Sequence, residues 1–377
     1  MFDNLKELCL LNGTSGNEDA VREYIINEIK DYAEYHIDNL GNIIAFKKGK
    51  KVPHKKIMLD AHMDEVALIV TSIQSDGTLT VDTVGGVDAS VVIGRQVIVG
   101  SEKLAGVAGA KAIHKLSKDE REKKPEIDSL YIDFGAENAD DAKKYVMPGD
   151  IVYFSSDYIE FGDNMIKSKA LDDRFGCALL IELIKSDLEY DAYFTFTVQE
   201  EIGLRGAKTA AFGVDPDIAI IVEATTAADI EGVPDNKKVC RLGDGAVVSF
   251  MDRSTMYDRE LYNYAFEISK EKNIKCQTKT MIAGGNNSGA VHVSGNGVRT
   301  IAVSAPSYTH STVGLLITLS NMTYSILFFS SAYLTSSSAP LNFAEFLPVT
   351  ISAFFPIWKT SLFSLTQSFP TITFVGI

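Results

Sequence analysis

The chain is poor in cysteine and in basic residues, and both shortages exclude classes of protein. Its four cysteines are widely spaced and form no Cys-x-x-Cys pair: Cys9, Cys177, Cys240 and Cys276. This argues against a disulfide framework and against a thiolate zinc site. Lys and Arg number 36 against 50 Asp and Glu, which gives a net charge of −14. Because nucleic-acid binding requires clustered basic residues, we expect no nucleic-acid partner.

Several familiar motifs are also missing. The N-terminal MFDNLKELCLLNG is interrupted by charges where a signal peptide needs an apolar run, so we expect a cytoplasmic protein. The Gly-rich AGGNNSGA lacks the lysine of a P-loop, and no Gly-x-Ser-x-Gly elbow occurs. With 377 residues, 46% of the chain hydrophobic and 23% charged, the sequence is long and apolar enough for two domains, or for one domain with an insertion.

Helix and strand patterns in two parts of the chain predict an α/β domain. The segments LKELCLL and EDAVREYIINEIKDYAEY have apolar residues three and four apart, which is typical of helices. Ser15 or Asn17 is placed to cap the second helix. The runs KKIMLDAH, AYFTFTVQEE, PDIAIIVEAT and VRTIAVSAPSYTH are typical of buried strands in an α/β sheet. We assign residues 1–68 and 162–311 to this domain.

Residues 69–161 have a different texture. Short β-type segments such as GRQVIVG, SLYIDFG and MPGDIVYF alternate with Gly- and Asp-rich turns, and there is little amphipathic helix. This pattern predicts a small all-β domain inserted into the α/β chain.

The composition changes again after residue 311. Only Glu345 and Lys359 are charged among the 66 residues of 312–377, against 84 of the 311 residues before them. Residues 315–334 carry no charge and could span a bilayer by length. A membrane anchor usually has flanking Lys or Arg and less Ser and Thr, so we favour a shifted reading frame or altered terminus.

Polar residues that can bind metal follow four of the predicted strands, at the point where each strand ends. They are His62, the pair Glu200–Glu201, Glu223 and His310, and a further pair, Asp172–Asp173, precedes a helix. Ligand sites in open α/β sheets form beyond the carboxyl ends of the strands. Each residue alone has an ordinary structural explanation, such as helix capping or solvation. Five such groups together favour a metal site.

The predicted ligands are His62, Asp172, Glu201, Glu223 and His310, which suit zinc, cobalt or manganese better than calcium. Two imidazoles and three carboxylates exceed the needs of one tetrahedral ion. We therefore expect two divalent ions bridged by Asp172, with a water between them as the nucleophile. Of the adjacent glutamates, one would ligate and the other act as base. Asp64 is placed to orient His62.

Four segments resemble the dinuclear-metal aminopeptidases that form tetrahedral particles. They are DAHMDEVALIV, SKALDDRFGCALLIELI, TFTVQEEIGLRGAKTA and VEATTAADI, and the resemblance covers about residues 1–311. That group includes glutamyl and deblocking aminopeptidases, and members described as cellulases or endoglucanases. The resemblance implies a mixed-sheet, zinc-peptidase-like catalytic domain, and it makes the insertion a PDZ-like or barrel-like dimerisation domain.

The resemblance also implies roles for single residues. His62 and Glu223 would bind one metal ion, Glu201 and His310 the other, and Asp172 would bridge them. Glu200 would be the general base, and Asp64 would orient His62. The expected reaction is hydrolysis of the N-terminal residue of short peptides with zinc or cobalt. The expected assembly is a homo-oligomer in which dimers build a dodecamer, with no membrane partner.

The chain departs from the family pattern in three places. Asn287 stands where the family has Asp, APSYTH precedes the proposed His310 ligand, and the tail lacks the family's charged helix. Two alternatives therefore stay open. One is a glycoside hydrolase, which would need two carboxylates around a sugar and no metal cluster. The other is a non-catalytic or misfolded product of the altered C-terminus.

Overall fold

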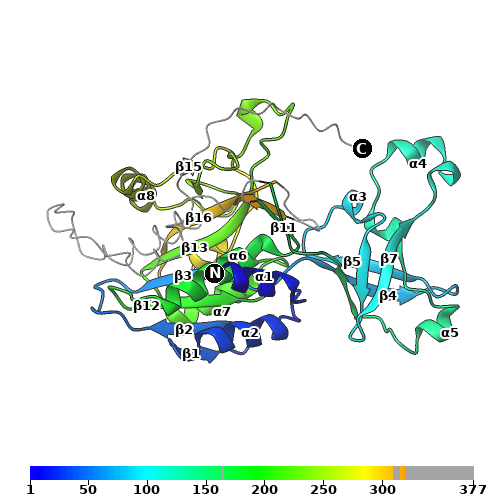
Figure 1. Cartoon of the computed structure of the whole chain (residues 1–377), viewed down its shortest axis with the longest axis horizontal. Helices are drawn as coiled ribbons and strands as arrows, with labels where there is room; N and C mark the ends of the chain where they lie inside the picture. Colours follow the sequence, from blue (N-terminus) through cyan, green and yellow to red (C-terminus); the bar gives the residue numbers. More distant parts are fainter. Residues whose placement is uncertain (163–164, 309–314, 319–377) are drawn as a thin grey trace, which may run out of the picture. The chain divides into compact units, whose positions relative to one another are not determined.

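The computed structural model describes residues 1–162, 165–308 and 315–318. In this part of the chain the strands form a large mixed sheet and a closed β-barrel (Figure 1). The predicted α/β fold with an inserted all-β domain is therefore confirmed. His310, and the tail from residue 312 apart from 315–318, lie outside the described residues.

The main sheet has 11 strands within the described ranges, in the order β1-β2-β12-β3-β13-β16-β17-β11-β10, with β14 and β15 joined to β16. Its centre is parallel: β12 pairs with β3, β3 with β13, and β13 with β16. These four strands end at the same edge, as parallel strands must. Their bounds are β3 (Ile57–His62), β12 (Ala192–Thr197), β13 (Ile218–Thr226) and β16 (Arg299–Ser307).

The outer strands are mostly antiparallel to their neighbours. They are β1 (Glu34–Ile37), β2 (Ile43–Lys47), β10 (Ile159–Phe161), β11 (Met165–Ser168), β14 (Ala246–Val248), β15 (Cys276–Thr278) and β17 (Leu315–Thr318). Two strands bear on the predicted boundaries. β10 falls in the range predicted for the insertion but pairs with β11, and β17 falls in the charge-poor range but pairs with β11 and β16. Both belong to the main sheet.

Helices cover both faces of the sheet, because side chains alternate across its strands. In β3, Ile57 and Leu59 pack with α1, α2 and α6, whereas Met58 packs with α7 and α9. By the same alternation Asp60 and His62 lie on the face of Met58. The helices are α1 (Phe2–Leu10), α2 (Asp19–Ile29), α6 (Leu171–Lys185), α7 (Arg205–Val214), α8 (Arg259–Lys272) and α9 (Ser288–Val291).

The inserted barrel closes in the strand order β4-β5-β8-β7-β6-β9, with every pair antiparallel. Its strands are β4 (Ala67–Ile73), β5 (Leu79–Val84), β6 (Gln96–Val99), β7 (Leu104–Ala110), β8 (Leu130–Asp133) and β9 (Ile151–Phe154). Short helices lie between them: α3 (Ala89–Val92), α4 (Lys118–Glu122) and α5 (Ala139–Ala142). The barrel has an apolar core of its own, separate from that of the sheet.

Across the described ranges, every helix is too short or too polar to cross a bilayer. The charge-free run 315–334 is described only at β17, which is a strand of the main sheet. The rest of that run lies outside the described residues.

Candidate metal centre

His62 is the last residue of β3, and its ring is almost fully buried, with 1% of the residue exposed. Its Nδ1 lies 3.1 Å from the main-chain carbonyl oxygen of Asp64. Because a carbonyl oxygen only accepts, Nδ1 carries the proton and donates this hydrogen bond. Nε2 therefore faces the carboxylates across the sheet edge, and it is the ring atom that could bind a metal ion.

Three carboxylates gather around Nε2 of His62. Asp172 Oδ1 lies 3.2 Å away, Glu223 Oε1 3.7 Å and Glu200 Oε2 4.0 Å. Glu223 lies within the buried part of β13, three residues before the strand ends, and its Oε1 also accepts the N–H of Ala224 at 2.9 Å. Two ligand groups result, His62–Asp172–Glu223 and His62–Glu200–Glu201, each with its donor atoms within 4.8 Å of one another.

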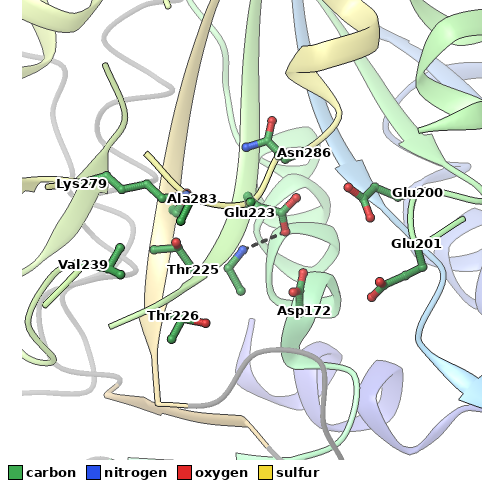
Figure 2. A pocket seen from close by; sticks show the side chains of 14 residues that line it. Asp172, Glu200, Glu201, Glu223, Thr225, Thr226, Val239, Lys279, Ala283 and Asn286 are labelled. Atoms are coloured by element: carbon green, nitrogen blue, oxygen red, sulfur yellow. Dashed lines mark hydrogen bonds between the residues drawn. The ribbon is translucent and has the colours of Figure 1, made fainter. Parts of the chain in front are cut away.

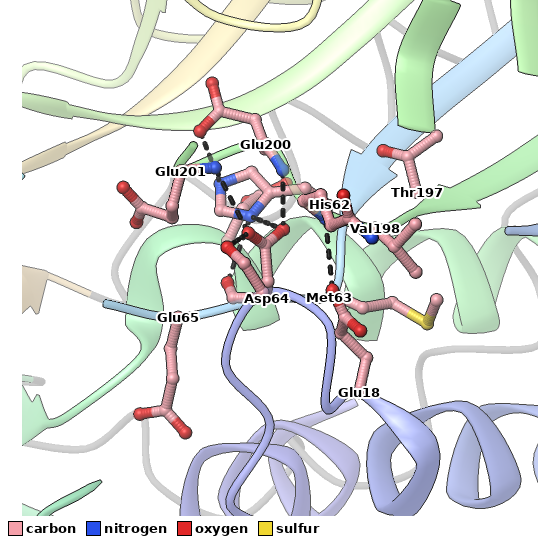
Figure 3. Close-up of polar contacts among 12 residues, drawn as sticks. Glu18, His62, Met63, Asp64, Glu65, Thr197, Val198, Glu200 and Glu201 are labelled. Atoms are coloured by element: carbon pink, nitrogen blue, oxygen red, sulfur yellow. Dashed lines mark hydrogen bonds and ion pairs between the residues drawn. The ribbon is translucent and has the colours of Figure 1, made fainter. Parts of the chain in front are cut away.

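The turn after β12 holds the two glutamates through the carboxylate of Asp64 (Figure 3). Asp64 is fully buried, and it accepts the main-chain N–H of Glu200 at 2.9 Å and of Glu201 at 3.1 Å. The hydroxyl of Ser15 donates to the same carboxylate at 2.6 Å. Burial favours the neutral acid, but the His62 ring and these donors outweigh it and lower the pKa of Asp64. Asp64 thus connects His62 to both glutamates.

The pair Asp172–Asp173 is divided between two environments. Asp172 points into the site and contacts His62, whereas Asp173 is fully buried and accepts the N–H of Gly176 at 2.9 Å. The capping explanation that is usual for such a pair therefore applies to Asp173. The peptide bond between the two residues is cis. The structure also corrects the predicted cap of α2: Glu18 is the N-cap residue, and Ser15 is instead a partner of Asp64.

The buried carboxylates of the site shift one another's pKa values and that of His62. Burial first, and then the charges of Asp172 and Glu200, raise the pKa of Glu201 well above its usual range. Burial and the charges of Asp172 and Asp173 do the same for Glu223. Burial lowers the pKa of His62, but Glu223 and Asp172 overcome it and raise that pKa. These shifts follow from several buried carboxylates that share one imidazole, and a divalent cation would relieve them.

The donor set fits metal ions of the zinc or cobalt type. It combines an imidazole nitrogen with carboxylate oxygens, and the hydrogen bonds of Asp64 orient its parts. The residues that the sequence analysis singled out are brought together wherever the structure describes them: His62, Asp64, Asp172, Glu200, Glu201 and Glu223. His310 lies outside the described residues.

A cavity of about 190 Å³ opens beside this cluster (Figure 2). Asp172, Glu200, Glu201 and Glu223 line one part of it, and Lys279, with Val239 and the loop 283–286, lines another. Lys279 and this loop were not predicted from the sequence. They follow β15, whose partner β14 joins the sheet through β16, so only the tertiary pairing brings them here. The signal available in the sequence was the position of Lys279, between Thr278 and Thr280 in the short segment CQTKTM.

Asn287 lies beneath the site, on the face of β3 that also carries His62. Its amide donates to Asp60 Oδ2 at 2.7 Å and to Thr197 Oγ1 at 2.8 Å, and all three residues are buried. Burial raises the pKa of Asp60 to about 6, although these donors and Thr195 oppose the shift. Asn287 therefore ties the loop that lines the cavity to β3 and β12.

Comparison with known sequences gives one consistent family. The model of the M42 glutamyl aminopeptidases matches residues 41–322. A candidate aminopeptidase of Acetivibrio thermocellus is 42% identical over 318 residues, covering 83% of this chain and 92% of that one. The glutamyl aminopeptidase of Lactococcus lactis subsp. cremoris is 32% identical, over 82% and 90%. The lysyl aminopeptidase of Pyrococcus furiosus is 32% identical, over 83% and 91%.

Solved structures with a similar fold point to the same family. The TET aminopeptidase of a marine sediment archaeon of the Thaumarchaeota superposes with a TM-score of 0.84 at 30% identity, covering 89% of this chain and 96% of that one. TET1 of Pyrococcus horikoshii, which assembles into a tetrahedron or an octahedral shell, gives 0.77 at 32% identity, over 88% and 98%. A Thermotoga maritima protein named endoglucanase gives 0.72 at 34%, over 88% and 96%.

Proposed function

The chain belongs to the M42 glutamyl aminopeptidase family, and from this membership we propose that it is a two-metal aminopeptidase with Glu200 as general base. The family fixes the reaction class as metal-dependent release of N-terminal residues from peptides. The number of ions, the residue roles and the preference for short peptides are our proposal for this chain. We take zinc or cobalt as the ions, because the donors are imidazole and carboxylate.

One observation supports the proposal above the others. His62 ends β3, Glu200–Glu201 follow β12, and Glu223 lies near the end of β13, and these three strands are adjacent and parallel. The donor atoms form two groups, His62–Asp172–Glu223 and His62–Glu200–Glu201, each within 4.8 Å. We propose that His62 and Glu223 hold one ion, that Glu201 and His310 hold the second, and that Asp172 contacts both. When bound, the ions supply Lewis-acid polarisation of the scissile carbonyl and acidify a water molecule.

Proton transfer and the positioning of the catalytic groups are carried out by side chains. Glu200 has 11% of its side chain exposed and lines the cavity, so it can reach both a water and a substrate. We propose that it takes the proton of the attacking water and delivers it to the nitrogen of the leaving peptide. Asp64 holds Glu200 in place through its main-chain N–H, and it keeps the proton of His62 on Nδ1.

The inserted barrel, residues 69–161 in the sequence analysis, is proposed as the dimerisation domain. A closed barrel has no free strand edge, so contact with a second subunit would use side chains on its outer surface. Structural relatives form tetrahedral particles, and one is a dodecamer. We extend this assembly to the present chain, with dimers as the building unit.

Substitution of Glu200 by Gln tests the mechanism, because the amide keeps the shape but cannot take a proton. We expect kcat to fall at least about 100-fold on peptide substrates, which is the typical contribution of a general base, while two ions per chain remain bound. Full activity in Glu200→Gln would remove Glu200 from the role of base. Loss of the metal with the activity would make it a ligand instead.

The name of the Thermotoga maritima relative raises a glycosidase as the competing activity. Cellulose-derivative hydrolysis and peptidase activity should be measured on one sample, before and after chelation. We expect only peptidase activity, lost on chelation and restored by zinc or cobalt. Glycosidase activity that survives chelation would refute the proposal, because two carboxylates around a sugar need no metal.

A further inference from the structure

Lys279 stands in the wall of the catalytic cavity with only 9% of its surface exposed. It follows β15, and its main-chain N–H donates to Val248 of β14 at 3.0 Å, so the pairing of β14 and β15 fixes its position. In Figure 2 its side chain extends past Ala283, on the side of the cavity opposite Glu200 and Glu201. The cavity therefore has an acidic end and one nearly buried cation.

The ammonium group of Lys279 makes no hydrogen bond and no ion pair with any residue that the structure describes. Asp252 acts on it electrostatically, but that carboxylate is itself buried and accepts from Ser254, Thr255 and Tyr257. Burial lowers the pKa of Lys279, and Asp252 and Glu223 only partly offset it. A nearly buried cation without a partner is costly, and such a group is kept where a ligand supplies the missing charge.

The cavity has the size of a side-chain pocket. Its volume of about 190 Å³ is below the roughly 300–1,000 Å³ of pockets that enclose drug-sized ligands. Since the proposed metal ligands occupy one end, the N-terminal residue of a bound peptide would place its reacting carbonyl there. Its side chain would then extend toward Val239, Lys279 and the loop 283–286.

Resting on the proposed aminopeptidase function, we propose that Lys279 is a specificity-determining residue that selects peptides with an N-terminal glutamate or aspartate. The carboxylate of such a side chain completes an ion pair that the described residues leave open. A neutral isostere gives only a neutral partner, and an N-terminal lysine or arginine brings a second cation against Lys279. Curated relatives at equal identity include a glutamyl and a lysyl enzyme, so sequence similarity alone does not decide this preference.

The test compares substrates that differ in charge but not in shape. The metal-loaded enzyme is assayed with glutamyl, glutaminyl, leucyl and lysyl p-nitroanilides. We expect kcat/KM for the glutamyl substrate to exceed that for the glutaminyl substrate roughly tenfold or more, which is about 1.4 kcal/mol. The lysyl substrate should be the poorest. Titration calorimetry with free glutamate and glutamine provides a binding readout that needs no turnover and should show the same order.

Lys279→Met removes the charge and keeps the length of the side chain. We expect the Glu-to-Gln ratio to fall to about one, with metal content retained. Lys275→Met is the matched control: this lysine is exposed on the same segment and donates to the carbonyl of Gly243, so the ratio should not change.

The outcomes separate the two proposals. A wild-type enzyme that cleaves leucyl or lysyl substrates without preferring glutamyl ones overturns the role of Lys279 and leaves the aminopeptidase standing. An unchanged ratio in Lys279→Met, with the protein folded and metal-loaded, does the same. Should that variant fail to fold, the wild-type ratio and the calorimetry still decide. An enzyme that cleaves none of the substrates and does not distinguish glutamate from glutamine overturns both proposals.

Discussion

Replacement of Asp64 by Asn tests whether this carboxylate supports the catalytic turn. Asp64 is fully buried and accepts three hydrogen bonds, from the N–H groups of Glu200 and Glu201 and from the hydroxyl of Ser15. An amide has one oxygen where the carboxylate has two. In either orientation its NH2 group faces one of the two main-chain N–H donors, and that donor loses its partner.

The expected cost follows from these contacts. A buried N–H left without an acceptor costs about 1–3 kcal/mol, and a lost hydrogen bond to a charged group costs about 1.5–3 kcal/mol. We therefore expect Asp64→Asn to lower the free energy of unfolding by roughly 3–5 kcal/mol, a large share of the about 5–15 kcal/mol that holds a typical domain. Ser15→Ala is the control: Ser15 is partly exposed, so water can replace its hydroxyl at a cost of about 1 kcal/mol.

Urea denaturation of both variants, with and without bound metal, measures these differences. In the folded Asp64→Asn protein we also expect kcat to fall, because Glu200 and Glu201 lose the anchor of their main chain. A loss of less than about 1 kcal/mol in Asp64→Asn, or an equal loss in Ser15→Ala, would refute the reasoning. It would mean that the turn is held by other contacts.

Two further predictions concern buried charge. Lys169 contacts both carboxylate oxygens of Glu65, at 2.6 and 2.8 Å, and both side chains are nearly buried, so Lys169→Met should cost about 3–5 kcal/mol in urea unfolding. Adding Glu65→Gln should recover part of that loss, and full additivity would contradict the pairing. The raised pKa values of Glu201, Glu223 and His62 mean that the metal-free folded state binds protons more tightly than the unfolded chain. The melting temperature of chelated protein should therefore fall as the pH rises from about 5 to 8 relative to metal-loaded protein, and parallel curves would contradict this.

The sequence was informative about elements and about the identity of the polar groups. Short β-type segments between turn signals were enough to predict an inserted all-β domain. Polar residues at strand ends were enough to bring His62, Glu200 and Glu201 together, because the ends of parallel strands share an edge. Glu223 was predicted to follow its strand, but it lies inside β13, three residues before the strand ends.

The sequence could not predict which distant segments lie next to one another in the fold. β3 lies between β12 and β13 in the sheet although a whole domain separates β3 from β12 in the chain, and no local pattern encodes that order. The division of labour between Asp172 and Asp173 depends on which carboxylate faces the N–H of Gly176. Lys279 reaches the cavity only through the pairing of β14 and β15, which are three residues each. Such short strands leave little periodicity to read.

The closed barrel also has a consequence for the order in which the chain folds. β3 and β12 are direct neighbours in the sheet, yet the barrel and the segment after it lie between them in the sequence. Bringing them together across an unstructured chain of that length carries a large loop-closure entropy, which slows folding.

The barrel removes part of that cost when it folds first. Its own pairs are all antiparallel, and its first and last strands are partners, with Leu68 opposite Val152 and Ile69 opposite Ile151. Once β4 and β9 have paired, the two ends of the insertion lie side by side, and the effective loop between β3 and β12 becomes much shorter. Residues 63–191 separate β3 from β12, and the pairing of Leu68 with Val152 leaves 63–67 and 153–191 as the effective loop. This loop has about a third of the original length, so the closure cost falls by roughly 1 kcal/mol. A barrel that folds first therefore brings β3 and β12 closer together and favours the assembly of the catalytic sheet.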